Sequence, residues 1–411
     1  MTFLRESQTA ALPQQGVGRS GNISTPQQSK ASERLASVDL LRGLVMIVMA
    51  LDHTRDFFAT GGFNPRDVAD PALFLTRWIT HFCAPTFIFL AGISASLYGA
   101  QGRTTGEVSR YLLTRGLWLV VIEFTVVRLG WMFAFDLNNF VTQVIFAIGM
   151  SMVALAALVH LPRWAVAMIG LGMMLGHNML DGVKAQSFGA AAPLWHLLHQ
   201  PGMIDLGAHI KVFALYPLIP WIGVMAAGYA LGPVLTLPRG PRLRWLTGLG
   251  LAAVAGFVLL RASNLYGDPA SWVRHDSLLS TVLSFVNCEK YPPSLLYLAM
   301  TLGPALLLLA IFDRARGKIA GAVTTFGRVP FFYYIVHLFV IHTLAVLFAG
   351  VTQGEVGWLF GGFPAGRPSG YGLGLPGIYA MWLVVIALLY PLCRWFASVK
   401  RTRREWWWTY L

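Results

Sequence analysis

The stretch Ser37–Phe58 reads SVDLLRGLVMIVMALDHTRDFF, in which an apolar run lies between two charged ends. A helix of about 20 residues crosses the hydrocarbon core of a bilayer, which is close to the length of this stretch. On such a helix Arg42 and His53 differ by only about 20° around the axis and by about 16 Å along it. One face of the predicted helix therefore carries a guanidinium near one end and an imidazole towards the other.

Most of the remaining chain has the same apolar character. The 411 residues are 56% hydrophobic and 12% charged, with a mean hydropathy of +0.60, whereas soluble domains are about 25% charged. A soluble chain this poor in charge could not cover its own surface. The composition excludes ordinary soluble enzymes, fibrous repeats and disordered proteins, and it favours one polytopic membrane domain.

Apolar segments of spanning length follow one another along the chain and predict an all-α membrane helix bundle. We expect about ten transmembrane helices, near residues 38–59, 72–99, 110–133, 139–160, 163–181, 212–236, 243–262, 292–312, 325–349 and 373–396. The polar segment 1–35 is expected to be a disordered tail. Segment 36–399 is then one transmembrane domain, and segment 400–411 is a basic, tryptophan-rich tail.

The basic residues indicate an orientation. Lys and Arg number 31 against 18 Asp and Glu, which gives a formal charge of +13, and they gather in every second connection between the apolar segments. Short cytoplasmic loops collect Lys and Arg, so we expect both termini to be cytoplasmic. This placement argues against nucleic acid as a partner. The expected partner is the lipid bilayer of the cell (inner or plasma) membrane, and a homodimer is left open.

Ionisable side chains inside predicted spans are costly and are functional by default. Asp52 and His53 lie in the first span, His81 in the second and His337 in the ninth. At 1.5 Å per residue, His53 and His81 lie at matching depths, roughly 9 and 12 Å below the same surface. An imidazole next to a carboxylate suits general-base work at neutral pH. The alternative is that each histidine only makes a hydrogen bond between helices.

We expect no metal. The intramembrane histidines do not form a pair with the usual helical spacing of metal ligands. The three cysteines, Cys83, Cys288 and Cys393, form no CxxC or Cys/His zinc pattern. No P-loop or dinucleotide-binding fingerprint occurs in the structural context that it requires.

Four short motifs carry a resemblance to a known family. They are Arg34-x-x-Ser37-x-Asp39-x-x-Arg42-Gly43, Pro85-x-Phe87-x-Phe89-x-x-Gly92, Lys290-Tyr-Pro-Pro-Ser294 and Gly327-Arg-Val-Pro330-Phe-Phe-Tyr-Tyr334-x-x-His337. Together they resemble the heparan-α-glucosaminide N-acetyltransferases and their many bacterial members, with the third motif typical of the bacterial branch. The resemblance covers about residues 34–397.

The resemblance implies a transmembrane acyltransferase. Its acetyl donor would be acetyl-CoA offered from the cytoplasm, and its acceptor an amine or hydroxyl, such as that of a sugar, near the outer side of the membrane. The spacing from Arg42 to His53 is also similar to that in the multi-span O-acyltransferases that modify bacterial surface sugars. We assign Arg42 and Asp39 to donor binding, because a guanidinium suits phosphate.

Our hypothesis for the chemistry is direct transfer in a ternary complex. His53, polarised by Asp52, removes a proton from the acceptor as it attacks the thioester. His81 or His337 stabilises the oxyanion or returns a proton to the thiolate.

One difference from the animal enzyme favours direct transfer over a covalent intermediate. In that enzyme a histidine proposed to carry the acetyl group lies before the second span. The corresponding place here falls near Pro71, which cannot carry an acyl group, and His81 corresponds to an acidic position.

A proton-coupled transporter of a small polar substrate is the alternative function. Intramembrane Asp, His and Arg also line proton and substrate paths. Transporters often carry two repeated halves with corresponding broken helices, and we find no convincing match between the halves of this chain.

Overall fold

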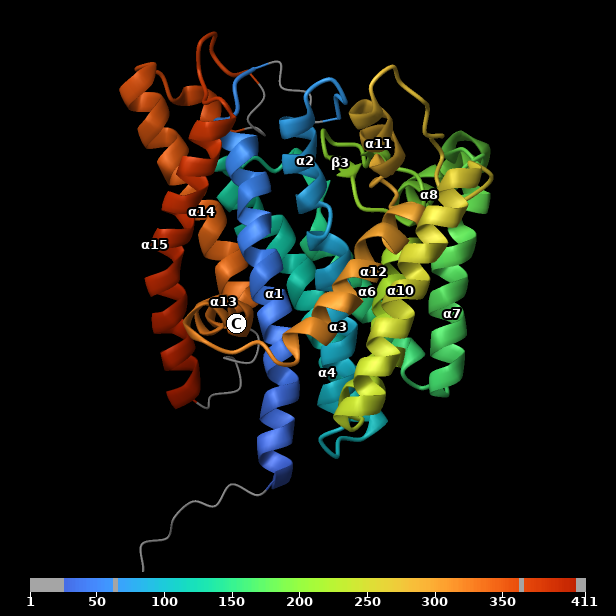
Figure 1. Cartoon of the computed structure of the whole chain (residues 1–411). Helices are drawn as coiled ribbons and strands as arrows, with labels where there is room; N and C mark the ends of the chain where they lie inside the picture. The colour runs from blue at the N-terminus through green and yellow to red at the C-terminus, as the bar shows by residue number, and fades with distance from the viewer. Residues whose placement is uncertain (1–25, 62–65, 362–365, 404–411) are drawn as a thin grey trace, which may run out of the picture.

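The computed structural model describes residues 26–61, 66–361 and 366–403. These residues form a helix bundle with a small sheet at its upper end in Figure 1. The α-helices are α1 (Pro26–Phe58), α2 (Pro71–Thr80), α3 (Cys83–Gly99), α4 (Thr105–Ile122), α5 (Arg128–Met132), α6 (Val144–Leu158), α7 (Arg163–Gly176), α8 (Ala192–Leu198), α9 (Leu218–Leu231), α10 (Arg239–Ser263), α11 (Leu278–Val286), α12 (Leu295–Phe312), α13 (Lys318–Arg328), α14 (Pro330–Thr352) and α15 (Leu375–Thr402). The strands are β1 (Asn139–Thr142), β2 (Gly202–Asp205) and β3 (Lys211–Ala214), paired in the order β1-β3-β2.

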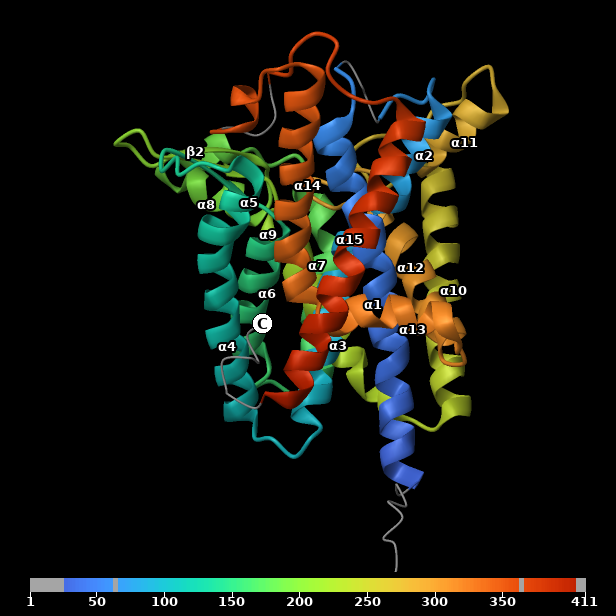
Figure 2. The ribbon, with the colours of Figure 1, turned by 90° about the vertical axis from the view of Figure 1, so that its left-hand side faces the viewer.

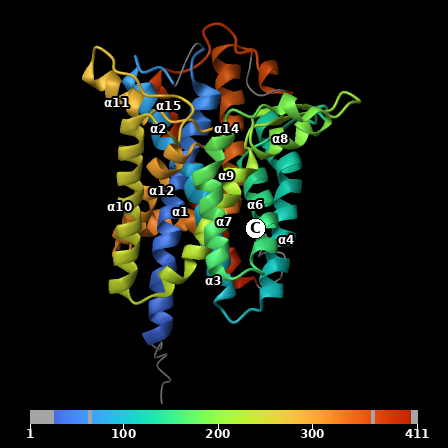
Figure 3. The same ribbon diagram turned by 90° about the vertical axis from the view of Figure 1, so that its right-hand side faces the viewer.

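The bundle has two distinct ends. The lower end in Figures 1 and 2 carries the start of α1, the turn between α3 and α4, and the end of α15. The upper end carries α2, α8, α11 and the sheet, and Figure 3 shows the same division from the other side.

Six helical segments of the described residues are long and apolar enough to cross a membrane. They are Pro71–Gly99, Leu218–Thr236, Arg239–Ser263, Leu295–Phe312, Pro330–Thr352 and Leu375–Thr402. A seventh would be Arg163–Leu180 together with Ala185–Leu198, two helices bent by 111°. The number of ten spans and the cytoplasmic position of both termini therefore remain predictions.

Helices α1, α4 and α6 lie within the bundle but fall outside this set. Helix α1 carries charged residues from Asp39 to Asp56, and α4 carries Arg110 and Arg115. Helix α6 has only 15 residues. Charge distinguishes α1 and α4 from the six apolar segments, and short length distinguishes α6.

The helices pack closely because glycines lie where they cross. Small residues let backbones approach inside membranes, where the apolar effect between helices is weak. The five most extensive helix contacts each bring together two glycines, namely Gly43 and Gly327 (α1–α13), Gly92 and Gly228 (α3–α9), Gly116 and Gly149 (α4–α6), Gly170 and Gly223 (α7–α9), and Gly250 and Gly303 (α10–α12). The tightest is the α1–α13 crossing, where a Cβ added at Gly327 would lie 1.8 Å from the carbonyl oxygen of Asp39.

The structure corrects several predicted boundaries. Residues 139–142 and 211–214 are strands rather than the starts of helices, so the fold is not purely helical. The second predicted span is broken between Thr80 and Cys83, and the ninth begins only at Pro330. Helix α1 begins at Pro26, so the last part of the predicted disordered tail is helical, while residues 1–25 and 404–411 lie outside the described residues.

Some polar residues inside the bundle serve the fold. Glu123 opens a π-helical turn (Glu123–Val127), and its carboxylate accepts a 2.9 Å hydrogen bond from the Phe146 backbone N–H in the first turn of α6. His342 places its two ring nitrogens 3.0 Å from the carbonyl oxygens of Gly130 and Leu359. These side chains connect neighbouring segments and are not part of the site described next.

Candidate active site

Helices α1 and α14 bring two histidines together. Nδ1 of His53 lies 2.7 Å from Nε2 of His337, and the two rings are stacked with centroids 4.9 Å apart. His337 is fully buried and His53 is half-buried. The indole of Trp131, from α5, stands edge-on to His53 at 4.9 Å and closes one side of the pair.

The neighbours of His337 determine which nitrogens carry protons. Nδ1 of His337 lies 3.1 Å from the Tyr333 carbonyl oxygen, which can only accept, so Nδ1 is the protonated nitrogen of this ring. Nε2 of neutral His337 is then an acceptor, and Nδ1 of His53 donates to it. Nε2 of His53 is left unprotonated, which is the state that a general base requires.

Asp52 faces a different partner. Successive helical residues point about 100° apart, and the Asp52 carboxylate pairs with Arg55 at 2.6 Å. Arg55 also contacts Asp56 at 3.0 Å. The hydrogen-bond partner of the His53 imidazole is therefore His337. Because Asp52 pairs with Arg55, it can act on His53 only through the electrostatic effect of its charge.

His81 lies in a separate environment, at the break between α2 and α3. Its ring is buried 5.3 Å from the ring of Tyr297 in α12, and the Tyr297 hydroxyl donates to the His81 carbonyl oxygen at 2.8 Å. Among the described residues neither ring nitrogen of His81 has a hydrogen-bond partner. The structure thus joins His53 to His337 and not to His81, because equal depth on two helices does not fix where the side chains point.

Arg42 and Asp39 lie together one turn apart on α1. Nη1 of Arg42 donates to Asp39 at 3.0 Å and to the Gly327 carbonyl oxygen of α13 at 3.1 Å. Nη2 donates to the Ser94 hydroxyl of α3 at 2.9 Å. The guanidinium is therefore held in one orientation by three helices.

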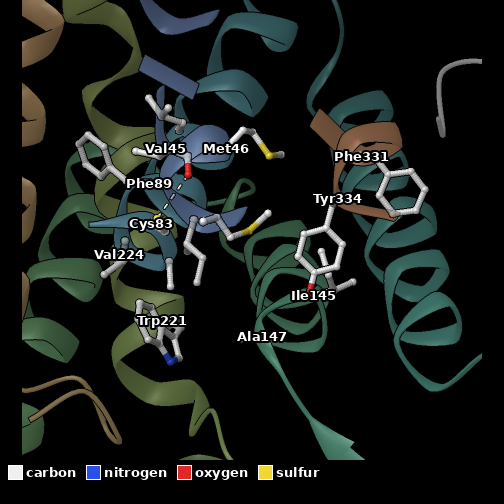
Figure 4. Close-up of a cluster of buried hydrophobic side chains, with 14 of the residues drawn as sticks. Val45, Met46, Cys83, Phe89, Ile145, Ala147, Trp221, Val224, Phe331 and Tyr334 are labelled. Atoms are coloured by element: carbon white, nitrogen blue, oxygen red, sulfur yellow. Dashed lines mark hydrogen bonds between the residues drawn. The ribbon is translucent and has the colours of Figure 1, made fainter. Parts of the chain in front are cut away.

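A cavity of about 330 Å³ opens beside Arg42. Its cationic lining residues are Arg42, Arg115, Arg328 and Lys400, and no acidic side chain of the described residues lines it. The rest of its wall is mainly apolar and comes from α1, α3, α4, α6 and α14. Figure 4 shows four of these side chains, Met46, Ile145, Phe331 and Tyr334.

Tyr334 connects this cavity to the histidine pair. It lines the cavity, and its ring packs edge-on against His337 with centroids 5.3 Å apart. Its hydroxyl is buried and has no hydrogen-bond partner among the described residues. Tyr334 therefore lies between the cavity and His337, which is the hydrogen-bond partner of the candidate base His53.

Three of these residues were not among the site residues predicted from the sequence. Tyr334 lies three positions before His337, so helical spacing alone places it on the same face. Arg115 is an arginine in an otherwise apolar part of α4, which is itself a signal. Lys400 was assigned to the tail, and only the packing of α15 brings it to the cavity.

Comparison with known proteins agrees with the motifs. The family model for the catalytic domain of heparan-alpha-glucosaminide N-acetyltransferase matches residues 34–260, more than half of the chain. The match includes Arg42, His53 and His81 and ends before the segment that carries His337. No curated protein matches the chain. The chain therefore belongs to the heparan-alpha-glucosaminide N-acetyltransferase family, a family of membrane acetyltransferases that act on sugar amines.

Proposed function

We propose that the protein transfers an acetyl group from acetyl-CoA, bound at the lower end, to an amine or hydroxyl of a sugar that approaches from the upper end. The observation that carries this proposal is the hydrogen bond from His53 to His337. It leaves Nε2 of His53 ready to accept a proton within the same bundle as a cation-lined cavity.

The cavity has the chemistry that acetyl-CoA needs. Phosphates are held by arginine and lysine, and the pantetheine arm needs an apolar channel. A second cavity of about 390 Å³ shares Arg328 and Lys400 with the first and adds Arg394 and Arg401. The two cavities together offer cations for the adenosine phosphates and, beyond Arg42, an apolar path towards Tyr334.

The transfer step needs one base and one oxyanion donor. Nε2 of His53 accepts the acceptor's proton while the acceptor nitrogen or oxygen attacks the thioester carbonyl carbon. The Tyr334 hydroxyl donates to the carbonyl oxygen as it becomes negative. The C–S bond then breaks, its electron pair goes to sulfur, and the thiolate takes the proton from His53.

His337 keeps the base in the correct form during this cycle. The imidazolium formed on His53 still donates its Nδ1–H to His337, so its orientation does not change between proton uptake and release. This is the positioning role that the buried partner of a catalytic histidine has in a triad.

The charge pattern supports the proposed sidedness. The lower end carries the basic turn before α4, the basic start of α10 and the basic end of α15. Since positive loops are retained in the cytoplasm, this end faces the compartment that contains acetyl-CoA.

The test is a transfer assay on the purified full-length protein in proteoliposomes, with radiolabelled acetyl-CoA and glucosamine. We expect Arg42→Gln to raise the KM for acetyl-CoA by about 10- to 100-fold, the effect of losing a hydrogen bond to a charged group. The KM for S-acetylpantetheine, which lacks the adenosine phosphates, should change much less. Arg110→Gln, an exposed position on α4 at the same end, is the control and should behave like the wild type.

Two results would overturn the proposal. One is an unchanged donor KM in a correctly folded Arg42→Gln protein. The other is uptake of the amino sugar driven by a pH gradient without acetyl-CoA, which would identify a transporter.

A further inference from the structure

Three side chains of types that ligate metals, two histidines and an aspartate, come together after α7 and after α8. Figure 1 shows that the upper end of α7 lies next to α8, away from α1 and α14. His177 begins the 3₁₀ turn His177–Leu180 that extends α7, Asp181 follows that turn, and His199 follows α8. One ligand atom from each residue lies within 4.8 Å of the other two. The bend between α7 and α8 brings His199 back onto a pair, His177 and Asp181, that is already spaced by one helical turn.

The two imidazoles have fewer partners than their burial requires. Each histidine is only 2% exposed. Nε2 of His199 lies 3.3 Å from the Asp181 carboxylate, but Nδ1 of His199 and both nitrogens of His177 make no hydrogen bond of acceptable geometry within the described residues. The Pro293 backbone lies beside the His177 ring without completing such a bond. Buried polar atoms normally have partners, so these three nitrogens are available to a ligand.

The Asp181 carboxylate is held on both of its oxygens. One oxygen lies 3.3 Å from Nε2 of His199. The Asn178 amide donates to the second carboxylate oxygen at 2.9 Å. A carboxylate fixed by a neighbouring amide is a typical outer partner of a metal site.

We propose that His177, Asp181 and His199 form a binding site for a divalent transition metal ion of the zinc type. Two imidazoles and one carboxylate are a common three-ligand set for zinc, with water in the fourth position. Ligand atoms around tetrahedral zinc are about 3.4 Å apart. His199 and Asp181 already lie at 3.3 Å, and the separations to His177 need to shorten by at most about 1.4 Å.

The proposed ion stabilises the upper end of the bundle rather than the chemistry of transfer. Besides donating to Asp181, Asn178 accepts a 2.8 Å hydrogen bond from the Leu295 backbone N–H. The site is thereby connected to the first turn of α12 and to the preceding segment that contains Lys290. The expectation of no metal rested on His53, His81 and His337, and it left out His177 although that residue also lies in a predicted span.

The experiment uses the full-length protein, purified in detergent without any histidine tag. After dialysis against EDTA, zinc is added back, and the metal content and melting temperature are measured. We expect about one equivalent of tightly held zinc per chain and a melting temperature that falls with EDTA and returns with zinc. Cobalt in place of zinc should give visible d–d absorption bands, which report direct ligation.

Variants separate a built site from chance binding. His177→Gln and Asp181→Asn should each weaken metal affinity by at least about 100-fold. His196→Gln is the matched control, because His196 lies on α8, three residues before His199, but contacts the Gln200 carbonyl instead. If His177→Gln does not fold, Asp181→Asn still provides the test, because the Asp181 side chain is partly exposed. Wild-type protein that retains no zinc, or equal zinc and cobalt binding by Asp181→Asn and wild type, would overturn the proposal and leave an adventitious ion only.

Discussion

His53 and His337 lie 284 positions apart in the chain, yet they share a 2.7 Å hydrogen bond between α1 and α14. The two side chains are chemically identical, and only their surroundings give them different tasks. The Tyr333 carbonyl oxygen fixes the proton on His337, and His337 in turn fixes the proton on His53. The Tyr333 carbonyl, one turn before His337, therefore determines which nitrogen of the proposed base is unprotonated.

The role of His337 is tested by two substitutions at this position. Leucine cannot accept a hydrogen bond, so His337→Leu should release the His53 tautomer and lower kcat by about 100-fold or more. Glutamine can accept through its side-chain oxygen, so His337→Gln should retain much more activity. The measurement is kcat for acetyl transfer in both variants.

A purely structural histidine would give another pattern. In that case both His337 variants would lose activity in proportion to lost stability, with kcat per folded molecule unchanged. His160→Gln is the control for preparation, because His160 is exposed at the end of α6.

The neighbouring tyrosines Tyr333 and Tyr334 offer a matched pair. Both hydroxyls are buried and without a hydrogen-bond partner among the described residues, but only Tyr334 lines the cavity. Tyr334→Phe should lower kcat by about 100-fold with little change in donor KM, as expected for a lost oxyanion donor. Tyr333→Phe should leave kcat nearly unchanged. Equal kcat values for the two variants would contradict the proposed oxyanion role.

The crossing of α1 and α13 is sensitive to one methyl group. Gly327→Ala would place a Cβ 1.8 Å from the Asp39 carbonyl oxygen, in contact with backbone rather than with a movable side chain. We expect this variant to lose the native melting transition or the monodisperse peak in size-exclusion chromatography.

Gly321, on the same helix, is the control for that substitution. A Cβ added there meets nothing within 4 Å, and alanine is favoured over glycine in a helix by up to about 1 kcal/mol. Gly321→Ala should therefore melt at the same temperature as the wild type or slightly higher. A Gly327→Ala protein as stable as Gly321→Ala would show that the crossing is looser than described.

Asp313 predicts a pH-dependent stability at the lower end. It accepts from Arg239 at 2.8 Å and from Arg242 at 2.5 Å, which connects the end of α12 to the start of α10. Burial opposes its ionisation, but these hydrogen bonds outweigh it and hold the pKa of Asp313 below its usual range. A carboxylate with a lowered folded pKa adds stability above its unfolded pKa, about 3.9, and this stability is lost as the pH falls through the folded value.

The measurement is the melting temperature as a function of pH for the wild type and Asp313→Asn. The wild type should be more stable above about pH 4, and the difference should shrink below it. Asp276→Asn, at an exposed position, is the control. A difference between wild type and Asp313→Asn that stays constant with pH would contradict the assignment.

The sequence predicted much of this arrangement because helical spacing is a local property. It placed Asp39 and Arg42 one turn apart and singled out His53 and His337, and the structure brings the members of each pair together. It could not pair His53 with His337 rather than His81, because that choice depends on how α1 rotates against α14.

Other features depended on tertiary structure from the start. The strand at 139–142 exists only because residues 211–214 lie beside it. Lys400 reaches the cavity only because α15 packs against the rest of the bundle. The cluster of His177, Asp181 and His199 needs the bend between α7 and α8, whereas the sequence placed His177 and Asp181 in a predicted span and His199 in the connection after it.

The ion pair of Arg42 with Asp39 has a consequence for turnover. Spent CoA carries the same phosphates as the loaded thioester, so an unopposed guanidinium would retain both equally well and delay regeneration of the free enzyme. Asp39 already neutralises part of that charge at 3.0 Å, which weakens the grip on any incoming anion. In the proposed donor site, Asp39 is therefore expected to shorten the time that the product stays bound, and release of the product limits the rate of many enzymes.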